Sequence, residues 1–247
     1  METAALSPLR EWGDRWVAAA AKAGIDSAVP QRKLGRDAHF EEDSYWSPLS
    51  EAGMILAGTG AKILTSGNQS KKSLDEAKAR LAELSAGLRE AKHDALATYL
   101  HVTSFMLAGL ASWTEGRPEA AVANLTAAIK LQEPLAKNQK ASDPTLLFIP
   151  SWELLGQLAL VDADVIAPIV SSSKELASAL GTEGKVNASS LFSRSLEVRP
   201  GRGASLLGRC RALELEGAKT SAVDACWDKL DRQWKGADAG VRGVLRK

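Results

Sequence analysis

The chain has 247 residues, of which 45% are hydrophobic and 25% are charged, the composition of an ordinary globular protein. Its formal net charge of +1 gives no protein-wide field that would direct it to nucleic acid or to an anionic membrane. It shows neither a secretion signal nor a run of about 18 apolar residues, the length that a membrane-spanning helix needs. We therefore expect a cytoplasmic protein with no nucleic-acid partner and no membrane partner.

A first helix is predicted to begin at the Ser7–Pro8 pair, because serine caps free N–H groups and proline suits a first helical turn. Trp12 and Trp16 lie on one face of this helix, as expected for a helix that caps the end of a helical array. The alternative is a docking surface for a second copy of the chain. Helical periodicity is lost over residues 25–50, so residues 1–48 are predicted to form an N-terminal helix followed by an irregular loop.

From about residue 49 onward, apolar residues recur at helical spacing and no segment alternates with a period of two. The sequence therefore predicts an all-α protein without a sheet, with one helical domain over residues 49–247. The clearest apolar stripes are Leu74–Ala77–Leu81–Leu84–Leu88, Leu96–Leu100–Met106–Leu107–Leu110 and Ala121–Leu125–Ala128–Ile129.

The helical region contains an internal repeat. In each copy a small residue in one helix is followed, in the next helix, by a small residue and a larger one four positions apart. In the first and third copies a glycine breaks the chain between the two helices. The small residues allow two helices to approach closely, and the larger residue fills the space between them. The three copies are Phe105–Ala108–Gly109 with Gly116, Ala121, Leu125 and Pro134; Trp152–Leu155–Gly156 with Ala188, Phe192 and Pro200; and Leu207–Gly208 with Gly217, Ala222 and Cys226.

This pattern resembles the tetratricopeptide repeat, a helix–turn–helix unit of 34 residues. The resemblance covers residues 101–134, 149–200 and 203–236, with a weaker fourth copy around Ala57–Gly58. The phrases 115–121 and 234–238 are also similar to small stand-alone bacterial-type proteins of this superfamily. The resemblance implies a short right-handed superhelical array of antiparallel helical hairpins, with three clear units, one weak unit and an N-terminal capping helix. It carries no activity with it.

The second copy departs from the pattern. The interval from Gly156 to Ala188 is much longer than the interval from Gly109 to Ala121, which places an insertion at about residues 161–187. A short extra helix is predicted within it at 174–180.

The resemblance also implies a concave groove, lined by the first helix of each hairpin, that binds a peptide. Such a groove would be apolar at one end and basic at the other, and would suit a partner protein or peptide with an apolar anchor and an acidic or carboxylate group. The lysine and asparagine clamp that some relatives use for a chaperone carboxylate is absent. Alternatively, the apolar residues are buried against the neighbouring hairpin. The predicted groove residues are Thr103, Met106, Leu110, Trp113, Glu153, Gln157, Arg202, Ser205 and Arg209.

The residues that most often bind metals or carry redox chemistry give no strong signal. His93 and His101 are two helical turns, about 12 Å, apart, which is too far for one metal ion. His39 lies beside carboxylates that lack calcium-loop spacing, so a solvated charge run is expected there. Cys210 and Cys226 fall at apolar helical positions and are predicted to be buried free thiols. We predict no metal and no cofactor.

Two functions remain open. The leading hypothesis is a protein-interaction scaffold, because the repeat is present and no phosphate loop, dinucleotide fingerprint or nucleophile elbow is found. The alternative is an enzyme or small-molecule binder whose pocket is closed by the N-terminal segment and by the 161–187 insertion. In that case the segment around His39, Tyr45 and Trp46 is a candidate lid.

Overall fold

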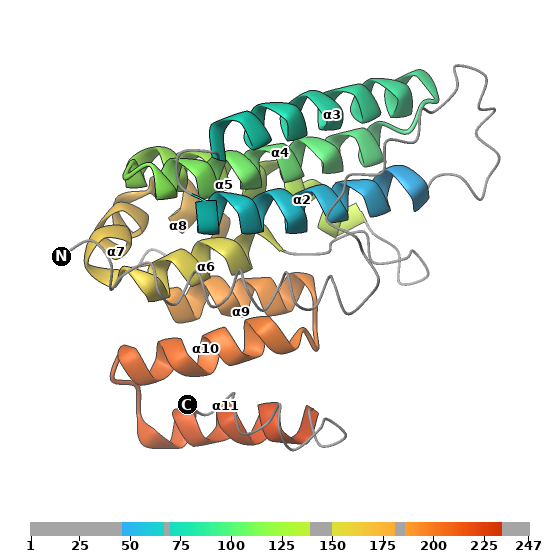
Figure 1. Ribbon diagram of the computed structural model, residues 1–247. Helices are drawn as coiled ribbons and strands as arrows, with labels where there is room; N and C mark the ends of the chain where they lie inside the picture. Colours follow the sequence, from blue (N-terminus) through green and yellow to red (C-terminus); the bar gives the residue numbers. More distant parts are fainter. Residues whose placement is uncertain (1–45, 67–69, 139–149, 181–185, 234–247) are drawn as a thin grey trace. The chain divides into compact units, whose positions relative to one another are not determined.

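A computed structural model describes residues 46–66, 70–138, 150–180 and 186–233 (Figure 1). The chain divides into two compact units, Met1–Phe148 and Ile149–Lys247. Within the described ranges every regular element is an α-helix, the helices pack in antiparallel pairs, and no strand occurs, which confirms the all-α prediction. The predicted helix with Trp12 and Trp16, the loop around His39 and the C-terminal residues 234–247 lie outside these ranges.

The described part of unit 1 contains four long helices: α2 (Trp46–Ser66), α3 (Ser70–Glu90), α4 (Asp94–Thr114) and α5 (Pro118–Asn138). Helix α4 is the centre of this unit, because α2, α3 and α5 all pack against it. By length and apolar composition α4 is able to cross a membrane, but 61% of its most apolar stretch is buried within the protein, as is typical of a core helix. The sequence predicts that Pro134 ends the first repeat, whereas α5 continues to Asn138. Packing against α4 therefore outweighs the unfavourable effect of proline on the last turns.

Among the residues that the structure describes, unit 2 has six shorter helices: α6 (Ser151–Val161), α7 (Ala163–Ser172), α8 (Lys174–Leu180), α9 (Ala188–Val198), α10 (Gly203–Leu215) and α11 (Thr220–Gln233). Helix α6 packs against α9 and α10, α9 packs against α10, and α11 packs against α10. The pairing of α6 with α9 across the intervening residues supports the predicted insertion.

Helices α7 and α8 lie within this insertion. The bounds of α8 are those predicted, whereas the sequence analysis does not predict α7. The structure shows why it forms: the Asp162 side chain accepts a hydrogen bond from the backbone N–H of Val165 at 3.3 Å and so caps the helix. Ile166 and Val170, one turn apart, are both fully buried.

Two of the predicted hairpin turns have the same geometry. Gly116 ends α4 with φ +71°, and Gly217 ends α10 with φ +65°. In each turn the N–H after the glycine reaches back to a carbonyl of the last helical turn, from Arg117 to Ser112 and from Ala218 to Leu213, both at 2.9 Å. This is a Schellman motif, in which a left-handed residue satisfies the free carbonyls of a helix end, and glycine adopts that conformation without strain.

The predicted close approach of helices is confirmed in two hairpins. A Cβ atom added at Gly109 would lie 2.8 Å from Leu125 Cγ, and one added at Gly156 would lie 3.0 Å from the Phe192 ring. The third hairpin differs from the prediction, because Gly208 faces Phe192 of the preceding helix and not Cys226. At Gly58, in the weak fourth copy, no described atom lies within 4 Å of such a Cβ.

Candidate functional site

The predicted groove residues of unit 1 lie on α4. Thr103, Met106 and Leu110 are buried, with exposed fractions of 2%, 1% and 2%, so their side chains are part of the core of this unit. Trp113 is partly exposed, but its indole Nε1 is buried and has no hydrogen-bond acceptor among the described residues. A buried indole N–H usually has a partner, which makes Trp113 the unusual member of this group.

In unit 2 three of the predicted residues meet in one buried network. The Glu153 side chain is 1% exposed and receives two parallel hydrogen bonds from the Arg202 guanidinium, from Nε to Oε2 at 2.5 Å and from Nη2 to Oε1 at 2.8 Å. The Ser205 hydroxyl donates to Glu153 Oε2 as well. Because that hydroxyl has one proton, Ser195 Oγ must be the donor in the 2.8 Å contact between the two serines. The network joins α6, α9 and α10.

This network changes the predicted electrostatics of the groove. The charge of Arg202 is matched by Glu153, and Ser205 is fully buried, so neither side chain is free for a partner. Gln157 and Arg209 remain partly exposed. Arg209 Nε is buried and has no acceptor among the described residues. In the described part of unit 2 the basic character of the predicted groove therefore rests on Arg209.

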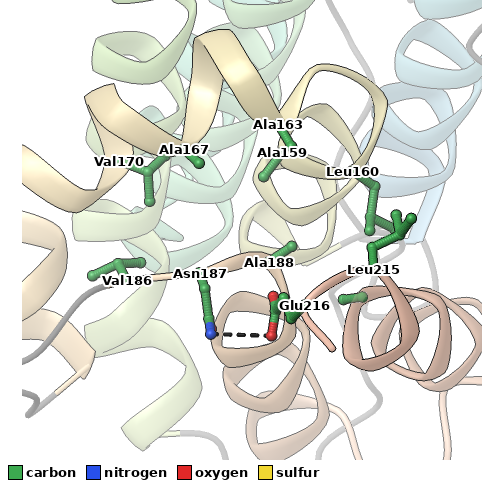
Figure 2. A pocket seen from close by; sticks show the side chains of 11 residues that line it. Ala159, Leu160, Ala163, Ala167, Val170, Val186, Asn187, Ala188, Leu215 and Glu216 are labelled. Atoms are coloured by element: carbon green, nitrogen blue, oxygen red, sulfur yellow. Dashed lines mark hydrogen bonds between the residues drawn. The ribbon is translucent and has the colours of Figure 1, made fainter. Parts of the chain in front are cut away.

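A separate cavity of about 120 Å³ lies within unit 2, beside the inserted helix α7 (Figure 2). Sequence reasoning did not identify its residues, although the insertion itself was recognised. The floor is closed by buried side chains, whereas the rim contains exposed residues, so the cavity is open to solvent on one side. The lining consists of Ala159, Leu160, Ala163, Ala167, Val170, Val186, Asn187, Ala188, Ala212, Leu215 and Glu216.

Glu216 is the only charged residue among the described residues that line the cavity, and its carboxylate is fixed in position. It accepts hydrogen bonds from Asn187 Nδ2 at 3.0 Å and from the backbone N–H of Ser189 at 2.9 Å. Asn187 is itself the N-cap of α9 and forms a capping box with Ser190. The two polar groups of the rim are thus bound to each other and to the start of α9, and the rest of the wall is apolar.

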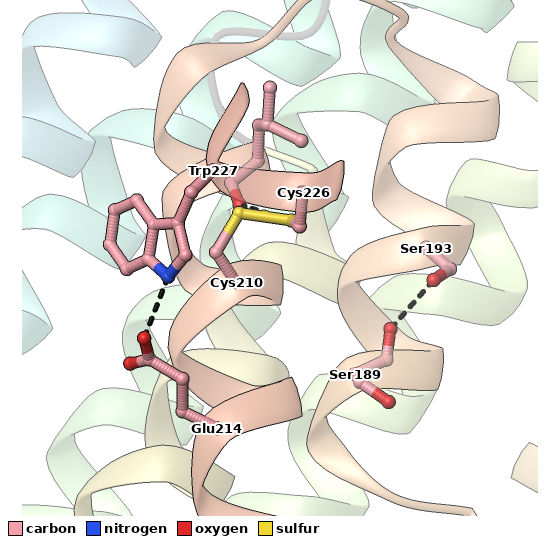
Figure 3. The surroundings of a disulfide bond; sticks show 7 residues. Ser189, Ser193, Cys210, Glu214, Cys226 and Trp227 are labelled. Carbon is pink, nitrogen blue, oxygen red and sulfur yellow. Dashed lines mark hydrogen bonds between the residues drawn. A yellow bond between two sulfur atoms is a disulfide. The ribbon is translucent and has the colours of Figure 1, made fainter. Parts of the chain in front are cut away.

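The two cysteines form a disulfide between α10 and α11, so the prediction of free thiols is wrong (Figure 3). The Cα atoms of Cys210 and Cys226 are 5.5 Å apart, because the turn at Gly217 folds the two apolar helix faces onto each other. The nearly central position of Gly217 between the cysteines was the signal that could have found the bond. Disulfides are typical of oxidising compartments, so this bond does not favour the cytoplasmic location, which stays a prediction.

The disulfide is part of a small hydrophobic cluster with Leu206 and Leu230. Trp227 packs against the cluster and donates a hydrogen bond from its indole N–H to Glu214 at 2.7 Å. Cys226 and Leu230 are the only buried residues among those described in α11. The attachment of this helix therefore depends on few side chains and on the disulfide.

The environment of His101 alters its acidity. Its Nε2 lies 3.3 Å from Ser85 Oγ, which also donates to the carbonyl of Ala97. Burial, together with the positive charge of Arg89, lowers the pKa of His101 below its ordinary value of 6.5. The described residues contain no group of three side chains suited to a metal ion.

Comparisons with protein-family models, with characterised proteins and with solved structures find no match to this chain. The contacts described above are therefore the basis for assigning a function.

Proposed function

We propose that the protein is an interaction module of tetratricopeptide-like helical hairpins that binds an acidic or carboxylate-bearing peptide, with Arg209 of unit 2 as the anchor. The observation that carries this proposal is the buried Nε of Arg209, which has no acceptor among the described residues. The Arg209 side chain is partly exposed, and a carboxylate is the strongest acceptor that a guanidinium has.

The hairpin packing supports the repeat assignment. Glycine-to-leucine and glycine-to-phenylalanine contacts join the paired helices α4–α5 and α6–α9, at the spacing on which the resemblance rests. Helices α6 and α10, the first helices of successive hairpins, also pack against each other. In that register Gln157 and Arg209 occupy equivalent positions, and both are partly exposed. Their side chains are the natural contacts for a peptide laid across α6 and α10.

The buried network sharpens the specificity that this proposal predicts. Because Glu153 already neutralises Arg202, a single guanidinium remains to receive a peptide carboxylate. We therefore expect one essential acidic group in the partner, with the rest of the affinity supplied by apolar contacts.

The test is a selection of peptides from a random library that displays free C-termini. Enriched peptides would then be measured by fluorescence anisotropy against wild type, Arg209→Gln and the control Arg211→Gln. Arg211 lies on the same helix but points about 200° away from Arg209, given 3.6 residues per turn.

We expect Arg209→Gln to weaken binding at least about tenfold, or about 1.4 kcal/mol, and Arg211→Gln to leave it unchanged. Neutralising the acidic group of the peptide should weaken binding to wild type but not to Arg209→Gln. Failure to enrich any peptide, or equal losses in the two arginine variants, would contradict the proposal.

A further inference from the structure

The cavity beside α7 lies within unit 2, and neither Gln157 nor Arg209 lines it. We propose that it is a binding site for a small uncharged apolar molecule, and that Glu216 at the rim excludes anions. This site is independent of the peptide-binding function proposed above.

The volume sets the size of the ligand. A cavity of about 120 Å³ is well below the range of roughly 300–1,000 Å³ that drug-sized ligands and cofactors occupy. It is close to the engineered apolar cavity of about 150 Å³ in another protein that binds benzene. A single six-membered ring or a branched chain of similar size therefore matches the space.

The composition of the wall sets the polarity of the ligand. Nine of the eleven lining residues are alanine, valine or leucine. Val170 and Ala212 in the floor are fully buried, and Val186 and Ala159 are 2% and 4% exposed. Such a wall offers no hydrogen bonds to a polar or charged ligand, so an uncharged apolar body is favoured.

The rim gives selectivity against anions. Asn187 and the N–H of Ser189 hold the Glu216 carboxylate beside the cavity, so its negative charge cannot swing away without losing two hydrogen bonds. A ligand carboxylate at the mouth would meet this charge. The positive end of the α9 dipole is already matched by Glu216 and does not offer a competing anion site.

The inserted segment is what makes the site. Ala163, Ala167 and Val170 come from α7, and Val186 and Asn187 from the chain that leads into α9. These residues lie outside α6 and α9 and line part of the cavity (Figure 2). The sequence also suggested a pocket closed by the N-terminal segment and by the insertion. The cavity involves the insertion, whereas residues 1–45 lie outside the described residues.

The experiment is a titration of the full chain with toluene and with benzoate, two probes that share a ring and differ in charge. Binding is followed by two-dimensional methyl NMR of the cavity valines and leucines and by thermal shift. Wild type should show saturable shifts at Val170 and Val186 with toluene, and at least tenfold weaker binding of benzoate.

Four variants separate the claims. Ala167→Leu fills the cavity from α7 and should abolish toluene binding, and Ala163→Leu, from an exposed position of the same helix, does so independently if the first variant folds poorly. Val165→Leu changes a 40% exposed side chain of α7 outside the lining and should bind as wild type does. Glu216→Gln should leave toluene binding intact and bring the affinity for benzoate to within about threefold of the affinity for toluene.

Absence of saturable toluene shifts in wild type, or undiminished binding in both cavity-filling variants, would overturn the site. Normal toluene binding with an unchanged benzoate deficit in Glu216→Gln would overturn the role of Glu216. Neither result bears on peptide binding at Arg209, which is measured separately.

Discussion

Replacing Gly208 by alanine should destabilise unit 2, although alanine is the better helix former. Gly208 lies inside α10, where an alanine would normally add about 0.8–1 kcal/mol of stability. A Cβ atom at this position would, however, overlap Cε1 and Cζ of Phe192 and lie 2.9 Å from Cδ1. The ring has little room to retreat, because it is fully buried and also packs closely against Gly156.

The size of the effect follows from the two opposing contributions. Forcing one extra carbon into a packed core costs roughly 1–3 kcal/mol. Gly87 in α3 provides a matched control, since no described atom lies within 4 Å of a Cβ added there. Gly87→Ala should therefore stabilise the protein by about 0.5–1 kcal/mol. The difference between the two variants removes the propensity gain and isolates the steric cost.

The assay is urea unfolding followed by circular dichroism, with the free energy of unfolding compared for wild type, Gly208→Ala and Gly87→Ala. Phe192→Leu added to Gly208→Ala should recover part of the loss relative to the sum of the single changes, because the overlapping ring atoms are gone. A Gly208→Ala protein as stable as Gly87→Ala would refute the close-packing argument.

Three further predictions concern charge, covalent linkage and pH. Arg202→Met should lower the free energy of unfolding by about 3–5 kcal/mol, because it leaves the Glu153 carboxylate buried without its cation. Adding Glu153→Gln to the same chain should restore much of this stability, as measured by urea unfolding. Reducing the Cys210–Cys226 bond, which links residues 16 positions apart, should lower the free energy of unfolding by about 3 kcal/mol and speed amide hydrogen exchange in α11. Reductant should have no effect on a Cys210→Ser/Cys226→Ser protein. Because the pKa of His101 is lowered in the folded protein, the unfolded chain binds more protons than the folded chain near this pH. The free energy of unfolding should therefore be highest above pH 6.5 and should fall as the pH drops from 6.5 toward the folded-state pKa. His101→Gln should remove this part of the pH dependence.

The sequence by itself determined the helical class, the hairpin turns and the helix at 174–180. These features depend on local rules that act within one or two turns of chain. The glycines at 116 and 217 end helices because only the left-handed conformation satisfies the last carbonyls. The spacing of Gly109 and Leu125 predicted a contact because both positions follow from the 3.6-residue period of two adjacent helices.

The tertiary structure alone decided which faces met. Helical phase put Cys210 and Cys226 on apolar faces but did not show that those faces form one contact, so the disulfide was missed. Arg202 and Glu153 are 49 residues apart, and their pairing depends on α6 packing against α10, which no local pattern records. The cavity likewise requires α7 to lie beside the start of α9 and the end of α10, an arrangement fixed by the burial of Ile166 and Val170 and not by spacing along the chain. Local periodicity specifies the elements, whereas complementary side-chain shapes and charges from distant segments specify the sites.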